Sequence, residues 1–265
     1  MEAIIYFFIF IIGTLFGSFF TLAVYRIPIK QSIMYGRSYC PKCNHKLNFL
    51  DLIPVLSYIF LGGKCRYCKE KIRPRYIALE LLTGLAFLLF ALSIKIDIFN
   101  LEINKLVYLV FGMLYLSTLF IIGGIEKEQH IVSDSVLLFG LITQTIYIIY
   151  LYVLNVSIYK YVIYLFVIIL LILIDKLILR KKGNQNYTIK ILILCLYFAM
   201  FTMKKTIIIT ILATLLIVAT KYLIISCKKN KNSILDKSKN KKMPIGFYLC
   251  ASNIVALILQ NYIIY

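Results

Sequence analysis

Long apolar segments constrain the fold of this chain more than any other feature of its sequence. Of its 265 residues, 62% are hydrophobic and only 15% are charged, whereas soluble domains carry about 25% charged residues. The apolar residues fall in runs close to the roughly 20 residues that a helix needs to cross a bilayer. The sequence therefore predicts an all-α polytopic membrane protein in contact with the lipid bilayer.

Eight apolar segments can be drawn as membrane-spanning helices. They cover residues 3–25, 76–94, 106–125, 132–154, 159–179, 189–203, 207–227 and 247–265. The first run is too long for a secretory signal peptide and lacks both a preceding basic region and a small-x-small cleavage site, so we interpret it as a retained span. The sixth is short because Lys204 and Lys205 follow it directly.

The net charge of +19 is concentrated in three loops. Residues 26–75 carry eleven Lys or Arg against two acids, residues 228–242 carry seven Lys, and residues 180–182 are all basic. With eight spans, these loops lie on one side, which the positive-inside rule assigns to the cytoplasm. Both termini then lie outside. Because topology accounts for the basic charge, we expect no nucleic-acid partner.

Two Cys-x-x-Cys pairs lie in the first basic loop, at Cys40 and Cys43 and at Cys65 and Cys68. This spacing is typical of a zinc ribbon, in which two tight turns direct four thiolates at one tetrahedral ion. Two disulfides are disfavoured in a reducing compartment, and a redox pair usually occurs singly. His45 could replace a sulfur, although four cysteines already complete the site.

Three segments follow from these features. Residues 1–25 are expected to form the first transmembrane helix, residues 26–75 a small cytoplasmic zinc-binding loop, and residues 76–265 a seven-helix membrane domain. Within the loop, the apolar run 52–61 is too short to span a bilayer. It is expected either to pack on the metal site or to enter the membrane interface.

Several motifs resemble those of the type IV prepilin peptidase family. Gly17-Ser18-Phe19 precedes Tyr25-Arg26-Ile27-Pro28, and the block from Ser38 to Gly84 follows the family's paired cysteines, its D-x-I-P-x-L-S-Y segment and its I-x-P-R-Y-x-x-x-E-L-L-T-G segment. Met243-Pro244-Ile245-Gly246-Phe247 is similar to the family's I-P-F-G-P, keeping the proline and glycine.

The resemblance implies a multi-pass protein of the bacterial inner membrane, with its peptidase-like region at about 106–265. Such an enzyme cuts the basic leader from pilin-like precursors that carry an apolar N-terminal helix, at the cytoplasmic face. It then methylates the new N-terminus with S-adenosylmethionine. Cleavage uses an aspartic pair, one acid ionised and the other protonated.

Both catalytic motifs of the family are altered in this chain. The first aspartate position holds Glu126. Asp134 follows eight residues later, which is the separation between the two acids of that segment in the family. We therefore predict Glu126 and Asp134 as the catalytic residues. The second motif, G-x-G-D, aligns with Thr188 at its aspartate or, when shifted, with Asn186. Neither side chain exchanges protons near neutral pH, so Glu128 and Asp175 are further candidate acids.

Three functions remain open from the sequence. The first is an enzyme that processes pilin-like precursors. The second is a catalytically degenerate homologue that keeps the fold and the zinc loop as a binding or assembly protein. The third, an unrelated zinc-bearing transporter, is disfavoured because no internal repeat is visible. Glu80, one turn inside the second span, is a candidate for the methyl-transfer region, and Asp175 could instead pair with Lys176 or Lys182.

Overall fold

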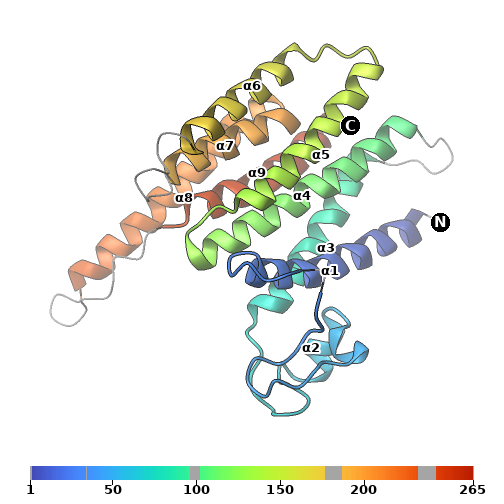
Figure 1. Ribbon diagram of the computed structural model, residues 1–265, viewed down its shortest axis with the longest axis vertical. Coiled ribbons are helices and arrows are strands. Elements are labelled where there is room, and N and C mark those ends of the chain that lie inside the picture. Colours follow the sequence, from blue (N-terminus) through green and yellow to red (C-terminus); the bar gives the residue numbers. More distant parts are fainter. Residues whose placement is uncertain (1, 34, 96–101, 177–186, 232–242, 265) are drawn as a thin grey trace. The chain divides into compact units, whose positions relative to one another are not determined.

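The computed structural model describes residues 2–33, 35–95, 102–176, 187–231 and 243–264, and within these the chain is all-helical (Figure 1). The helices are α1 (Glu2–Arg26), the 3-10 helix η1 (Phe49–Leu52), α2 (Leu56–Phe60), α3 (Arg75–Ile94), α4 (Ile103–Gln129), α5 (Asp134–Val153), α6 (Tyr159–Ile174), α7 (Tyr187–Phe201), α8 (Lys204–Lys231) and α9 (Ile245–Ile264).

The long helices confirm the predicted membrane architecture. Within the described residues, six helices are long and apolar enough to cross a membrane: α1, α3, α4, α5, α8 and α9. Two shorter apolar helices, α6 and α7, coincide with two further predicted spans. The basic cluster 180–182 and residues 232–242 of the last basic loop lie outside the described residues. The predicted division at residues 25 and 75 stays a prediction.

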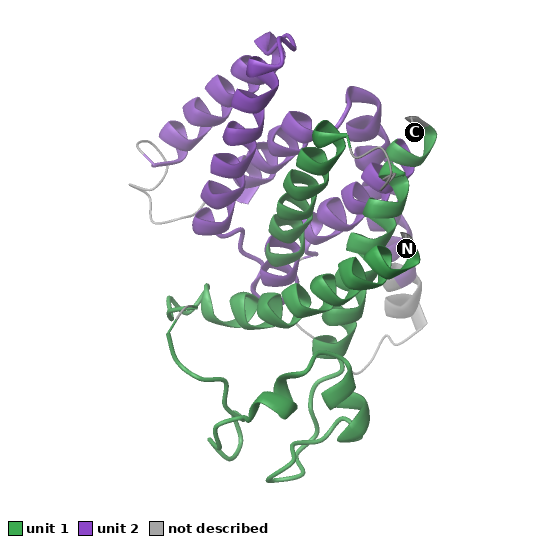
Figure 2. Cartoon of the chain, turned by 90° about the vertical axis from the view of Figure 1, so that its right-hand side faces the viewer, with its two compact units in different colours: residues 1–121, 261–265 green, residues 122–260 purple. Residues whose placement is uncertain are grey.

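The chain forms two compact units, residues 1–121 with 261–265 and residues 122–260 (Figure 2). In the first unit, α1 and α3 pack at very short range. A Cβ on Gly13 would lie 2.8 Å from the Cα of Gly84, and one on Gly17 would lie 2.7 Å from the Cα of Glu80. Small residues allow such approach between membrane helices, so these glycines fix the helix pair that carries the cysteine loop.

Polar side chains connect α8 and α9 in the second unit. Thr206 and Thr210 are one turn apart and buried on α8. The Thr206 hydroxyl donates to Oε1 of Gln260, and the Asn253 side-chain amide donates to the Thr210 hydroxyl at 3.2 Å. Hydrogen bonds of this kind hold transmembrane helices together, each contributing about 0.6 kcal/mol on average.

Candidate metal centre and candidate active site

The two cysteine pairs form the same backbone turn twice. The N–H of Cys40 donates to the carbonyl of His45 at 3.0 Å, and that of Cys65 donates to the carbonyl of Glu70 at 2.8 Å. Each turn is closed by an isolated antiparallel bridge, Tyr39 with Lys46 and Lys64 with Lys71. These matching turns place the two sulfurs of each pair on one side.

The four sulfurs converge on a single point. The Sγ atoms of Cys40, Cys43, Cys65 and Cys68 lie within 4.8 Å of one another, and those of Cys40 and Cys68 are 3.8 Å apart. All four thiols are free rather than paired in disulfides. A tetrahedral zinc ion with Zn–S bonds of about 2.3 Å separates its sulfurs by about 3.8 Å. The residues present therefore fit a closed, structural zinc site, as the spacing predicted.

The acidity of the thiols agrees with a site that holds a cation. Burial would raise the pKa of the Cys40 thiol, but hydrogen bonds from the backbone N–H groups of Cys43 and Lys42 outweigh it and lower the pKa to about 7. At Cys68, a backbone hydrogen bond with Glu70 lowers the pKa, whereas burial and the other cysteines raise it to about 11. Four crowded sulfurs cannot all ionise cheaply without a compensating ion.

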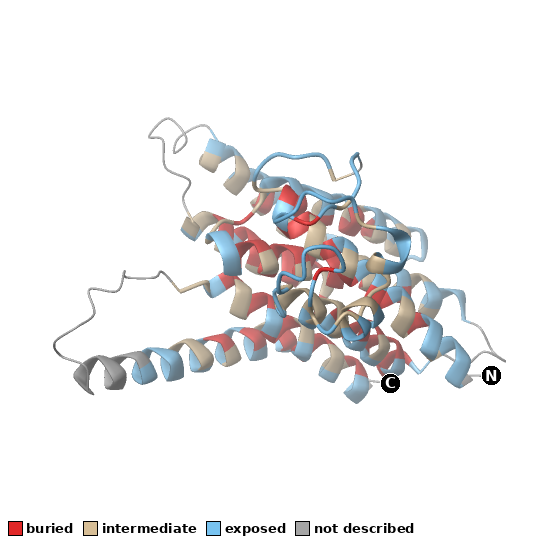
Figure 3. Ribbon diagram, turned by 90° about the horizontal axis from the view of Figure 1, so that it is seen from below, coloured by how far each residue is buried: buried red, intermediate tan, exposed pale blue. Residues whose placement is uncertain are grey.

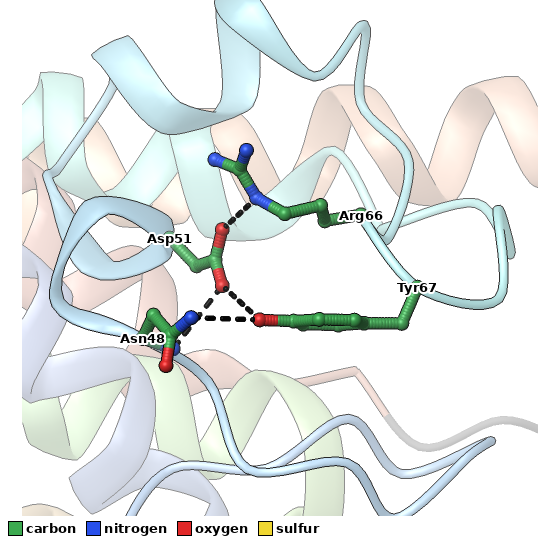
Figure 4. Close-up of polar contacts among 4 residues, drawn as sticks. All are labelled: Asn48, Asp51, Arg66 and Tyr67. Atoms are coloured by element: carbon green, nitrogen blue, oxygen red, sulfur yellow. Dashed lines mark hydrogen bonds and ion pairs between the residues drawn. The ribbon is translucent and has the colours of Figure 1, made fainter.

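A polar cluster joins η1 and the residue before it to the second cysteine turn (Figure 4). Asp51 Oδ1 accepts a hydrogen bond from Arg66 Nε at 2.6 Å, and its Oδ2 accepts from the Tyr67 hydroxyl at 3.3 Å and from the backbone N–H of Asn48 at 3.1 Å. The Asp51 side chain is only 3% exposed. Burial raises its pKa, but Arg66 and the Asn48 N–H hold the pKa below its usual value. His45 packs on Tyr67, with ring centroids 3.6 Å apart.

Glu80 attaches the loop to the membrane helices. Its Oε2 accepts a hydrogen bond from the backbone N–H of Val55 at 2.8 Å, and the Ser18 side chain of α1 is a further hydrogen-bonding neighbour. Ser18 belongs to the Gly-Ser-Phe motif and Glu80 to the Glu-Leu-Leu-Thr-Gly motif noted in the sequence. Both motifs therefore serve to dock the loop on the α1–α3 pair.

Glu126 lies in the last turn of α4, with no exposed surface. Its Oε1 accepts hydrogen bonds from the Tyr187 hydroxyl at the start of α7 and from the backbone N–H of Gly246 at 2.8 Å. The Tyr187 hydroxyl also accepts from the N–H of Ile245 at 3.1 Å. The N-terminus of α9 thus points at a carboxylate, the charge that helix N-termini favour.

The space beside the Glu126 carboxylate admits only a glycine at position 246. A Cβ there would lie 2.8 Å from Cδ of Glu126 and closer still to Oε2. Oε2 itself has no hydrogen-bond partner among the described residues. Because glycine alone lets the backbone come this close, the Met-Pro-Ile-Gly-Phe segment brings α9 onto Glu126.

Asp134, the other predicted catalytic acid, has a different partner. It begins α5, its side chain is 64% exposed, and its Oδ1 lies 2.7 Å from Nζ of the buried Lys190. Lys190 also donates to the carbonyl of Val132 at 3.1 Å. Lys190 lies two residues after Thr188, the position aligned with the aspartate of the second motif. Glu126 and Asp134 thus have different partners, and the pairing of these two acids stays a prediction.

The remaining predicted positions are placed as follows. Thr188 is exposed on α7, Glu128 is exposed near the end of α4, and Asp175 is half-buried just after α6. Asn186 lies outside the described residues. Sequence reasoning missed Tyr187, which stands at a glycine position of the family's second motif. Its only signal was that an aromatic residue replaced a glycine beside the expected acid.

This fold and site define a class of protein: a multi-pass helical membrane protein with a four-thiolate loop between its first two spans. Residues 11–94 match the family model described as the Bacterial Peptidase A24 N-terminal domain. This match, together with several relatives at 31–45% identity, supports the type IV prepilin peptidase family for this chain.

Three relatives are each named prepilin leader peptidase/N-methyltransferase. The protein of Myxococcus xanthus (strain DK1622) is 45% identical over 80 residues, which cover 30% of this chain and 24% of that protein. The Klebsiella pneumoniae protein is 31% identical over 137 residues, 49% and 56% of the two chains. The Bacillus subtilis (strain 168) protein is 36% identical over 133 residues, half of each chain. No solved structure matches the chain significantly.

The matched regions thus span about a quarter to about half of the length of these curated relatives. The family model covers α1, the cysteine loop and α3. It ends before α4 begins and so does not include Glu126.

Proposed function

We propose that this chain processes pilin-like precursors at the cytoplasmic face of a bacterial inner membrane. It would remove a leader peptide and methylate the new N-terminus. The observation that carries the proposal is the buried Glu126 carboxylate, held at the end of a membrane span by Tyr187 and the N-terminus of α9. The names of the relatives support the same reaction.

The depth of Glu126 suits such a substrate. It lies three residues before the end of α4, at the boundary of the span. A precursor whose apolar helix lies in the bilayer presents the junction with its basic leader at the same level. Buried donors that fix a carboxylate before the substrate arrives reduce the cost of orienting it in the reaction.

The residues would take distinct roles in peptide cleavage. Glu126 would act as the base that removes a proton from the attacking water, and Asp134 as the acid that protonates the scissile carbonyl. Asp134 would first have to give up its ion pair with Lys190 and turn to the substrate. The four-cysteine site is closed and would stabilise the loop without entering the chemistry. S-adenosylmethionine would supply the methyl group.

A second candidate function is binding or assembly without cleavage. The hydrogen-bond donors on Glu126 come from Tyr187 and Gly246, and Asp134 is ion-paired with Lys190. Such an arrangement suits two carboxylates that hold helices together. Under this alternative, the chain would recognise the precursor through the retained loop and helices but leave its leader in place.

The proposal is tested with the purified full-length chain in lipid. The chain is incubated with a precursor that carries a basic leader and an apolar helix. The wild type is expected to remove the leader, and Glu126→Gln to reduce the rate at least about 100-fold, because general acid–base groups contribute factors of that size. Glu102→Gln, exposed and just before the other end of the same helix, is the matched control and should keep wild-type activity.

Two outcomes would redirect the proposal. Cleavage that is undiminished in Glu126→Gln would assign the chemistry to another group. Binding of the precursor by the wild type with no cleavage over long incubation would establish the second candidate in its place.

A further inference from the structure

The short helix α2 presents an apolar face that nothing in its own loop covers. Leu56, Ile59 and Phe60 are spaced i, i+3 and i+4, so they lie on one side of the helix. Their exposed fractions are 51%, 60% and 82%. The loop around them is largely exposed as well (Figure 3). Although the cysteine turns are formed, these three side chains remain at least half exposed.

The contact between Val55 and Glu80 sets the depth of α2 relative to the membrane span. Val55 directly precedes α2, and its N–H donates to Glu80 at 2.8 Å. Glu80 is the sixth residue of α3, about 7.5 Å along the helix from its first residue at a rise of 1.5 Å per residue. Because α3 is a candidate membrane span, α2 begins level with the first turns of that span.

The residue before α2 has an unusual backbone conformation. Val55 has φ 61° and ψ −53°, a conformation that a β-branched residue adopts only when its surroundings impose it. A chain that pivoted freely at this point would relax this residue to an extended conformation. The hydrogen bond to Glu80 therefore acts together with the local fold to orient α2.

The charge around α2 complements an anionic surface. Five basic residues and a single acid, Glu70, lie between α2 and α3. The basic residues are Lys64, Arg66, Lys69, Lys71 and Arg73, of which Arg66 is ion-paired with Asp51. An apolar helix face flanked by Lys and Arg is typical of helices that lie in the membrane interface. Each such basic residue near an anionic bilayer contributes about 1 kcal/mol of attraction.

We propose that α2 is an interfacial helix, lying on the anionic bilayer surface with Leu56, Ile59 and Phe60 inserted at the level of the headgroups. The loop would then be held to the membrane at three places: at the ends of α1 and α3 and through α2. This inference does not depend on the proposed catalytic activity.

The absence of tryptophan from the sequence allows a direct test. Phe60→Trp and Ile59→Trp each place one fluorophore on the exposed face of α2, where both side chains are more than half exposed. Tyr39→Trp, in the first cysteine turn and 45% exposed, is the control. The full-length variants are compared in nanodiscs of phosphatidylcholine with phosphatidylglycerol, with and without lipids brominated on their acyl chains.

For Phe60→Trp and Ile59→Trp, the inference predicts blue-shifted emission and at least twofold stronger quenching by brominated lipid than for Tyr39→Trp. Replacing phosphatidylglycerol by phosphatidylcholine should weaken that quenching. The proposal would be overturned if brominated lipid quenched the emission of both α2 variants no more than that of Tyr39→Trp. A blue shift that occurs only when a precursor is added, without quenching by lipid, would also overturn it, because the face would then belong to a protein partner.

Discussion

Gly246 is the residue at which one added methyl group is expected to have the largest effect. Gly246→Ala would drive a Cβ into the Glu126 carboxylate, and overpacking of a buried site typically costs 1–3 kcal/mol. We expect a lower unfolding temperature in detergent and loss of the proposed processing activity.

Gly123→Ala is the matched control for this substitution. Its added Cβ would lie 3.4 Å from Cβ of Cys250, an ordinary contact, in the same unit. Equal unfolding temperatures for the two alanine variants would contradict the close approach of α9 to Glu126.

Tyr187 tests whether the phenol hydroxyl, rather than the ring, holds the carboxylate. Tyr187→Phe keeps the ring but removes the donor to Oε1 of Glu126. Oε1 keeps the hydrogen bond from the Gly246 N–H, but the loss of one hydrogen bond to a carboxylate costs about 1.5–3 kcal/mol. Thermal unfolding should therefore occur at lower temperature than in the wild type. An unchanged unfolding temperature would indicate that the hydroxyl contributes nothing to the site.

At the scale of elements, the cysteine loop depends on its metal. Chelation or Cys65→Ser is expected to abolish stoichiometric zinc and to expose residues between α1 and α3 to protease, while the helices remain intact. Structural zinc sites supply much of the folding energy of small loops. Elemental analysis and limited proteolysis measure the two effects.

Cys195→Ser provides the comparison, since Cys195 lies on α7 outside the cluster. This variant should keep both its zinc and its protease resistance. Zinc retention in Cys65→Ser equal to that in Cys195→Ser would refute the four-thiolate site.

The sequence predicted some elements well because strong physical constraints act on them locally. A bilayer demands long apolar runs, so α1 and the helices from α3 to α9 overlap the expected spans. The Cys-x-x-Cys spacing is also a local constraint, because it directs the two thiolates of one turn at the same metal ion. Nothing local indicated the orientation of α2, which depends on the bond between Val55 and Glu80, 25 residues apart.

The candidate active site was less predictable because its contacts are distant in sequence. Tyr187 and Gly246 lie 61 and 120 positions from Glu126. The motifs pointed to Glu126 and to the segment that contains Gly246, but they did not indicate that the two meet. Tyr187 replaces a motif glycine, so the resemblance directed attention away from it.

For the whole molecule, the central claim is that a precursor is cut at a site built around Glu126. The most direct measurement is the intact mass of a pilin-like precursor after incubation with the full-length chain in lipid, with and without S-adenosylmethionine. We predict loss of the leader mass in both cases, one added methyl group only with the cofactor, and no loss of the leader with Glu126→Gln. An unchanged precursor mass with the wild-type chain would contradict the account.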